Sequence, residues 1–132
     1  MTEQLLVEQA FSMLERSYCP YSGFPVGAAL LCSDGTVFTG CNVENAAYGS
    51  TICAERTALV KAVSEGHRDD FVSIAVAGRS DDYCWPCGAC RQMLCEFAPD
   101  LEILVARGDR SFVRCTLSEL LPHSFGPKTL KD

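Results

Sequence analysis

Apolar residues recur at regular spacing along most of the chain and predict its secondary structure. Spacing of three to four residues predicts helices over residues 3–18, 53–65, 87–97 and 117–121. Runs of β-branched and apolar residues predict strands over residues 26–32, 36–41, 71–77, 101–106 and 111–115. In this order the elements predict a single domain over residues 1–132 with an α/β fold, a three-layer α/β/α sandwich around one mixed five-stranded sheet.

Residues that favour helix ends and turns set the expected boundaries. Thr116 and Glu119 have the spacing of a capping box before the last predicted helix. The other expected boundaries are a cap at Thr2, a cap at Ser50 or Thr51, a hairpin turn at Ser33-Asp34-Gly35, a helix end at Gly66 and a first-turn proline at Pro86. After residue 121 the chain continues as a Pro-rich tail with no predicted element.

Composition narrows the range of partners. The 132 residues are 48% hydrophobic and carry a formal charge of −6, which disfavours a nucleic-acid partner because such binding depends on Lys and Arg. An uncharged small molecule fits this chain better. No apolar run reaches the length of a membrane span, and the N-terminus carries acids where a signal peptide would carry bases. We therefore expect a cytoplasmic protein that contacts no membrane.

The nine cysteines are an odd number without a secretory signal, which favours free thiols and metal binding over a disulfide framework. Cys53, Cys87 and Cys90 lie at the starts of two predicted helices, where the helix dipole favours thiolates. Three thiols and the carboxylate of Glu55 are the components of a catalytic zinc site whose fourth position stays open for water. Glu55 would then act as general acid and base.

Three thiolates would leave a net negative charge around a zinc ion. Arg56, next to the Cys53 element, is the expected source of compensating hydrogen bonds to sulfur, and Arg91 is the second candidate.

Other interpretations of these cysteines stay open at this point. A closed structural zinc site would need a fourth protein ligand, and the candidates are Cys84, Cys95, His67 and His123, with Cys84 the most credible. A redox pair would join Cys87 to Cys90. Both alternatives leave Glu55 without a role. The remaining cysteines are expected to be small buried apolar residues: Cys19, Cys32, Cys41, Cys95 and Cys115.

Three motifs together resemble a known family: Cys53-Ala-Glu-Arg, Pro86-Cys-Gly-Ala-Cys-Arg-Gln and Asn42-Val-Glu-Asn-Ala-Ala-Tyr. They are similar to the small zinc-dependent cytidine deaminases of pyrimidine salvage, in the three-cysteine, homotetrameric branch, and Pro-Cys-x-x-Cys is a known signature of zinc deaminases. The resemblance runs essentially end to end. It implies a cytidine deaminase-like fold and hydrolysis of cytidine and 2′-deoxycytidine to uridine and 2′-deoxyuridine, with release of ammonia.

The resemblance also implies a role for each matching residue. Cys53, Cys87 and Cys90 would bind Zn²⁺, and Glu55 would move protons to N3 and to the leaving amine while zinc hydroxide attacks C4. The backbone N–H of Ala54 would hold the pyrimidine O2. The other implied substrate contacts are Phe24 against the base, Asn42 and Glu44 on the ribose 3′-hydroxyl, and Ala46, Tyr48 and Phe125 from across subunit boundaries in a homotetramer.

Two rival functions remain at this stage. The first is a deaminase of the same fold that acts on a cytosine-bearing antibiotic of the blasticidin type or on a free base, which Asn42 and Glu44 as ribose contacts disfavour. The second is a non-catalytic zinc domain or thiol oxidoreductase. A deaminase that edits nucleic acid is disfavoured by the acidic composition.

Overall fold

The computed structural model describes residues 1–131 and contains the predicted sandwich. Its strands are β1 (Val26–Cys32), β2 (Val37–Cys41), β3 (Phe71–Gly78), β4 (Glu102–Ala106) and β5 (Phe112–Thr116). Its α-helices are α1 (Glu3–Ser12), α2 (Ala54–Ser64), α3 (Gly88–Phe97), α4 (Leu117–Leu120) and α5 (Pro127–Lys131), with two 3₁₀ turns, η1 (Met13–Arg16) and η2 (Tyr48–Ser50).

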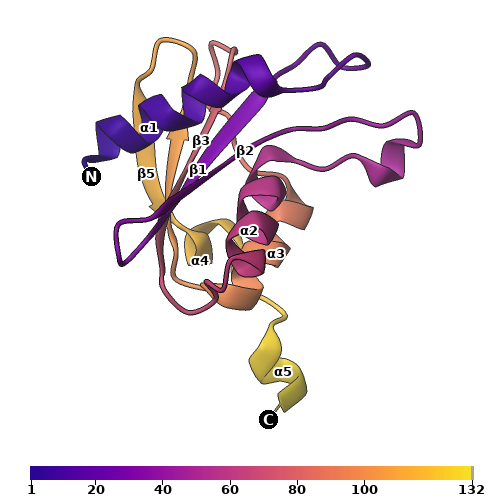
Figure 1. Ribbon diagram of the computed structural model, residues 1–132. Helices are drawn as coiled ribbons and strands as arrows, with labels where there is room; N and C mark the ends of the chain where they lie inside the picture. The colour runs from indigo at the N-terminus through magenta and orange to yellow at the C-terminus, as the bar shows by residue number, and fades with distance from the viewer. Residues whose placement is uncertain (132) are drawn as a thin grey trace.

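The five strands form one mixed sheet in the order β2-β1-β3-β4-β5. β3 and β4 are parallel, and the other neighbouring pairs are antiparallel. Helix α1 covers one face, while α2 and α3 cover the other (Figure 1). The predicted fold class is therefore confirmed.

Alternate residues of the central strands supply the two cores. Ala28 and Leu30 of β1 pack toward α2, whereas Ala29 between them packs toward α1. The same alternation places Ile103 and Leu104 of β4 in different cores. Since both faces of the sheet are covered, its central strands are mostly apolar, with Ser73 of β3 as a buried polar exception.

Several element ends differ from the sequence prediction. The first helix is shorter, because α1 ends at Ser12 and a 3₁₀ turn, η1, follows. Neither Ser50 nor Thr51 caps α2, since Cys53 occupies that position. Pro86 is not in the first turn of α3, because the N-cap, Cys87, follows it. The capping box of Thr116 and Glu119, the cap at Thr2 and the turn at Gly66, with φ of 96°, are confirmed.

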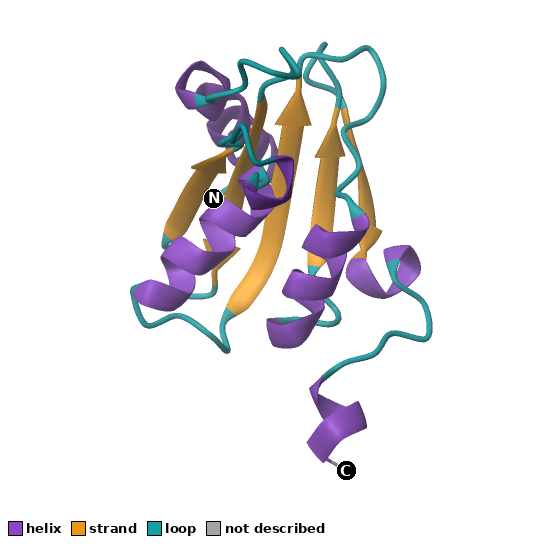
Figure 2. Cartoon of the chain, turned by 90° about the vertical axis from the view of Figure 1, so that its right-hand side faces the viewer, coloured by secondary structure: helices purple, strands orange, loops and turns teal. Residues whose placement is uncertain are grey.

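The Pro-rich tail contains a helix that no sequence pattern predicted. Helix α5 projects away from the sandwich in both views (Figures 1 and 2). Within residues 1–131, no helix combines the length and the apolar character that a membrane crossing requires.

Candidate active site

The three cysteines singled out from the sequence meet where α2 and α3 begin. Cys53 is the N-cap of α2, Cys87 is the N-cap of α3, and Cys90 lies in the first turn of α3. The sulfur of Cys87 is 3.8 Å from that of Cys53 and 3.4 Å from that of Cys90, and all three sulfurs lie within 4.8 Å of one another. The fold thus brings residues 34 positions apart into contact.

This group of sulfurs fits a zinc ion. Tetrahedral zinc with Zn–S bonds of about 2.3 Å separates its sulfur ligands by about 3.8 Å, close to the observed spacing. Among the residues described, the group that could hold an ion here consists of these three cysteines alone. Three protein ligands leave a fourth position for water or substrate, as in catalytic zinc sites.

Arg56 contacts the thiol cluster, whereas Arg91 turns away from it. The Arg56 guanidinium donates to the Cys53 sulfur at 3.3 Å and to the Thr51 carbonyl at 3.2 Å. Hydrogen bonds from Cys90 and then from Arg56 lower the pKa of Cys53 to about 5. Arg91 instead donates to the carbonyl oxygens of Pro86 and Leu120, both at 2.8 Å.

Glu55 lies in the first turn of α2 and is only 4% exposed. Burial is the main cause that raises its pKa to about 7, and the neighbouring Cys53 adds to the increase. Glu55 lines the same pocket as Cys53 and Cys87. A carboxyl group with this pKa can both accept and donate a proton near neutral pH.

The walls of this pocket come from the start of β1 and the segment before it, from the residue after β2, and from the loop before α3. Phe24, Val26 and Asn42 line one part, and Cys84 and Trp85 line another. The buried Asn42 amide accepts from the Val26 N–H and donates to the Phe24 carbonyl, both at 2.9 Å. Asn42 therefore fixes the entrance to β1, including Phe24, beside the thiols.

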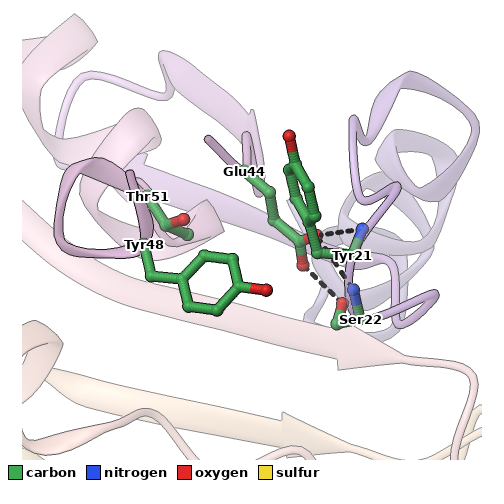
Figure 3. Close-up of a pocket in the computed structure, with 5 residues that line it drawn as sticks. All are labelled: Tyr21, Ser22, Glu44, Tyr48 and Thr51. Atoms are coloured by element: carbon green, nitrogen blue, oxygen red, sulfur yellow. Dashed lines mark hydrogen bonds between the residues drawn. The ribbon is translucent and has the colours of Figure 1, made fainter. Parts of the chain in front are cut away.

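A second hollow adjoins the first and shares Ser22 and Thr51 with it. Figure 3 shows its lining, in which Glu44 faces Tyr21 and Ser22 and lies near Tyr48. The Glu44 carboxylate accepts from the N–H groups of Tyr21 and Ser22 at 2.9 and 3.0 Å, and from the Ser22 hydroxyl. These hydrogen bonds, that of the hydroxyl first, lower the pKa of Glu44.

The structure gathers most of the predicted site residues within one chain. Phe24, Asn42 and Ala54 line the pocket of Glu55 and the thiols, and Glu44 and Tyr48 line the adjoining hollow. Ala46 is exposed in the loop that follows β2. Phe125 lies at a separate surface groove beside α5, where its carbonyl accepts from Gln92 at 2.7 Å.

Some lining residues carried no signal in the sequence. Ser22 and Thr51 are short polar residues in irregular segments, and only their place between the two hollows identifies them.

Cys84 lines the pocket but does not belong to the three-sulfur group within residues 1–131. Burial and then the charge of Glu55 raise the pKa of the Cys84 thiol to about 12, so this thiol stays protonated.

Known proteins are similar to this chain in both sequence and fold. Residues 1–105 match the family described as the cytidine and deoxycytidylate deaminase zinc-binding region. A cytidine deaminase from Halalkalibacterium halodurans is 47% identical over 133 residues and is matched over 100% of both chains. A 1.6 Å crystal structure of cytidine deaminase from Burkholderia pseudomallei has a TM-score of 0.92 and 46% identity, covering 95% of this chain and 100% of that chain. A blasticidin-S deaminase from Bacillus cereus is 33% identical over 74% of each chain.

The sandwich and its thiol-lined pocket are the framework of an enzyme in which three sulfurs, at the starts of two helices, could hold a metal ion. The chain belongs to the cytidine and deoxycytidylate deaminase family. The resemblance inferred from its three sequence motifs is therefore confirmed.

Proposed function

We propose that this chain catalyses the hydrolytic deamination of cytidine and 2′-deoxycytidine to uridine and 2′-deoxyuridine with release of ammonia. The observation that carries the proposal is the buried carboxyl of Glu55, which lines one pocket with Cys53 and Cys87. The full-length similarity to a cytidine deaminase supports the choice of substrate.

Cys53, Cys87 and Cys90 would hold Zn²⁺, and Arg56 would offset part of their negative charge through its hydrogen bond to the Cys53 sulfur. The bound ion supplies Lewis-acid activation of the attacking water. Glu55 would take one proton from the water and deliver it to N3. It would then take the second proton from the hydroxyl now attached to C4 and deliver it to the leaving amine. A C4–O bond forms, the C4–N bond breaks, and ammonia leaves.

The remaining predicted contacts position the nucleoside. The Ala54 N–H, at the start of α2, would donate to the pyrimidine O2, and Phe24 would pack against the base. Glu44 accepts three hydrogen bonds from Tyr21 and Ser22, and its two oxygens offer about four acceptor sites, so one remains for a ribose hydroxyl. The Asn42 amide has two N–H hydrogens, and one donates to the Phe24 carbonyl, so the other could donate to the ribose.

The proposal includes a homotetramer in which Ala46, Tyr48 and Phe125 of one subunit complete the pocket of a neighbour. Its support is their exposure, since Tyr48 is 72% exposed and Phe125 is 55% exposed in the single chain. Aromatic residues are enriched in protein–protein interfaces, and these two side chains are available to a neighbouring subunit. A cytoplasmic role in pyrimidine salvage completes the proposal and agrees with the nine free cysteines.

A second candidate substrate is a cytosine-bearing antibiotic of the blasticidin type, which the similarity to the Bacillus cereus deaminase favours. Its identity to this chain, 33%, is lower than the 47% of the cytidine deaminase. Parallel turnover assays with cytidine, 2′-deoxycytidine, cytosine and blasticidin S distinguish these possibilities.

The test of the mechanism is Glu55→Gln, which keeps the size of the side chain and removes its acid. We expect the parent to release ammonia from cytidine and the variant to lose about 10²- to 10⁴-fold in kcat, with the same zinc content in both. Ammonia release, the ultraviolet change of the base and a zinc assay give these values. Full activity in the variant would show that Glu55 is not the proton carrier.

A further inference from the structure

A second cluster of potential metal ligands lies away from the catalytic thiols. Cys32 ends β1, Asp34 lies in the β1–β2 turn, and His67 and Asp70 lie in the connection between α2 and β3. One potential ligand atom from each lies within 4.8 Å of all the others. The catalytic cysteine Cys53 is at the other end of α2, and a helix of this length spans about 15 Å. The two clusters are therefore separate sites.

Backbone hydrogen bonds hold the segments that carry this cluster. The Ser33 N–H donates to the Asp70 carbonyl at 2.8 Å, which joins the β1–β2 turn to the segment before β3. Within the turn, the Thr36 N–H donates to the Asp34 carboxylate at 2.9 Å. The His67 N–H donates to the Ala62 carbonyl at 3.0 Å, at the end of α2. The four side chains thus approach one another from segments whose backbone is held in place by hydrogen bonds.

The cluster has an excess of negative charge. His67 Nδ1 lies 2.8 Å from one oxygen of Asp70, but the other oxygen of Asp70 is buried and has no hydrogen-bond partner within residues 1–131. Among the described residues, His67 is the only basic side chain that pairs with either carboxylate of the cluster. A cation would supply the missing partner for the buried oxygen.

The electrostatics of Cys32 agree with this charge excess. Cys32 is 1% exposed, and burial followed by the charges of Asp70 and Asp34 raises its pKa to about 11. The same charges that disfavour a free thiolate favour a bound divalent cation, which would in turn stabilise the thiolate.

We propose that Cys32, Asp34, His67 and Asp70 form a second zinc site, one that closes the β1–β2 turn onto the α2–β3 connection. One thiol, one imidazole and two carboxylates are all established zinc ligands, and four of them make a closed, structural type of site. The sulfur disfavours Mg²⁺ and Ca²⁺, which prefer oxygen ligands alone. Zinc bound here would stabilise the folded state, because the unfolded chain does not hold the four residues together.

The test compares zinc stoichiometry in the parent and in variants of the full chain. Each protein is saturated with zinc and then freed of excess metal by gel filtration. The parent is expected to retain one more zinc ion per chain than His67→Ala or Cys32→Ala. Asp69→Asn is the matched control, because it removes a neighbouring exposed charge outside the cluster, and it should keep the parent value. The comparison depends on a difference of one ion, so it does not depend on the deaminase activity.

Cobalt provides a second readout, and its first measurement uses the parent protein alone. Parent protein holding one equivalent of zinc is titrated with Co²⁺, and the second ion should show tetrahedral ligand-field bands and a thiolate charge-transfer band. Cys32→Ser should weaken the charge-transfer band, since it replaces the only sulfur of the cluster. Equal retention of zinc in parent and variants, or a second Co²⁺ without the thiolate band, would overturn the proposal.

Discussion

Cys53 and Cys87 occupy N-cap positions in an extended backbone conformation, yet neither side chain caps its helix. The residues usually found there turn an oxygen back toward the helix N–H groups. A sulfur is free to point outward instead, and here the sulfurs of the two helix starts lie 3.8 Å apart. Two helix starts, set side by side, thereby bring the sulfurs of Cys53, Cys87 and Cys90 together.

The two arginines beside the thiols have different partners and should have different effects. Arg56→Ala removes the hydrogen bond to the Cys53 sulfur, and we expect zinc affinity to fall about 10- to 100-fold, as for other residues that support metal ligands. Arg91→Ala leaves two carbonyls without their donor and should lower the free energy of unfolding by about 1–3 kcal/mol while retaining zinc.

Competition with a chelator measures zinc affinity, and urea unfolding measures stability. Weaker zinc retention in Arg91→Ala than in Arg56→Ala would reverse the assignment of these two residues.

The Ser22 hydroxyl contributes most to the lowered pKa of Glu44, which lines the hollow beside the Glu55 pocket. Ser22→Ala removes the hydroxyl that contributes most to the lowered pKa of Glu44, so that pKa should rise toward its ordinary value. A carboxylate with a lowered pKa stabilises the fold above its unfolded pKa and loses this contribution as pH falls through the folded pKa. The variant should therefore show a smaller loss of stability on acidification.

Carbon-detected NMR titration of Glu44 in parent and Ser22→Ala measures this shift directly. Ser64→Ala, at the far end of α2, is the control, because its hydroxyl donates to the Lys61 carbonyl and is remote from Glu44. An unchanged titration of Glu44 in Ser22→Ala would show that the backbone N–H groups alone set its pKa.

At the scale of elements, the close packing of α2 on β2 sets the positions of Cys53 and Glu55. A Cβ atom on Gly40 would lie 2.4 Å from the Ala54 carbonyl oxygen and 2.6 Å from the Ala58 nitrogen. Both are backbone atoms, so a larger residue would have to move the helix itself. Gly40 thereby allows the helix that carries Cys53 and Glu55 to lie directly on the sheet.

Gly40→Ala should lower both stability and activity. Overpacking at a tight contact costs typically about 1–3 kcal/mol, and a displacement of about 1 Å at a catalytic group can cost up to about 10²-fold in rate. Gly126→Ala is the control, because the nearest atom to its added Cβ is the Cys95 sulfur at 3.9 Å. Thermal unfolding and kcat/KM for cytidine check both effects, and a fully active Gly40→Ala would refute this role.

The sequence predicted helices and strands correctly where the local pattern of residues was strong. Apolar periodicity located all five strands and the helices of the sandwich, and the capping box located the start of α4. The caps of α2 and α3 were missed because cysteine is not a usual N-cap residue. Helix α5 was missed because its few residues show no amphipathic repeat.

At the scale of the whole molecule, the single chain leaves large apolar side chains on its surface, including Trp85 at 48% and Leu130 at 79% exposed. Under the tetramer proposal, light scattering should give a mass four times the 14.4 kDa of one chain. Phe125→Ala should reduce kcat/KM although Phe125 lies at a groove separate from the Glu55 pocket of its own chain. A monomeric mass with full activity would contradict the shared pocket.

The sequence by itself determined the fold class and the family, and it named Cys53, Cys87 and Cys90 as candidate metal ligands. The fold class follows from apolar periodicity within each element, and the family follows from the resemblance of three short motifs, in one of which Cys87 and Cys90 lie within one helical turn. Only the tertiary structure decided which groups meet across the chain, such as Cys53 with Cys87, Ser22 with Glu44, and Cys32 with His67. Such contacts depend on strand order and helix packing, which no local pattern encodes.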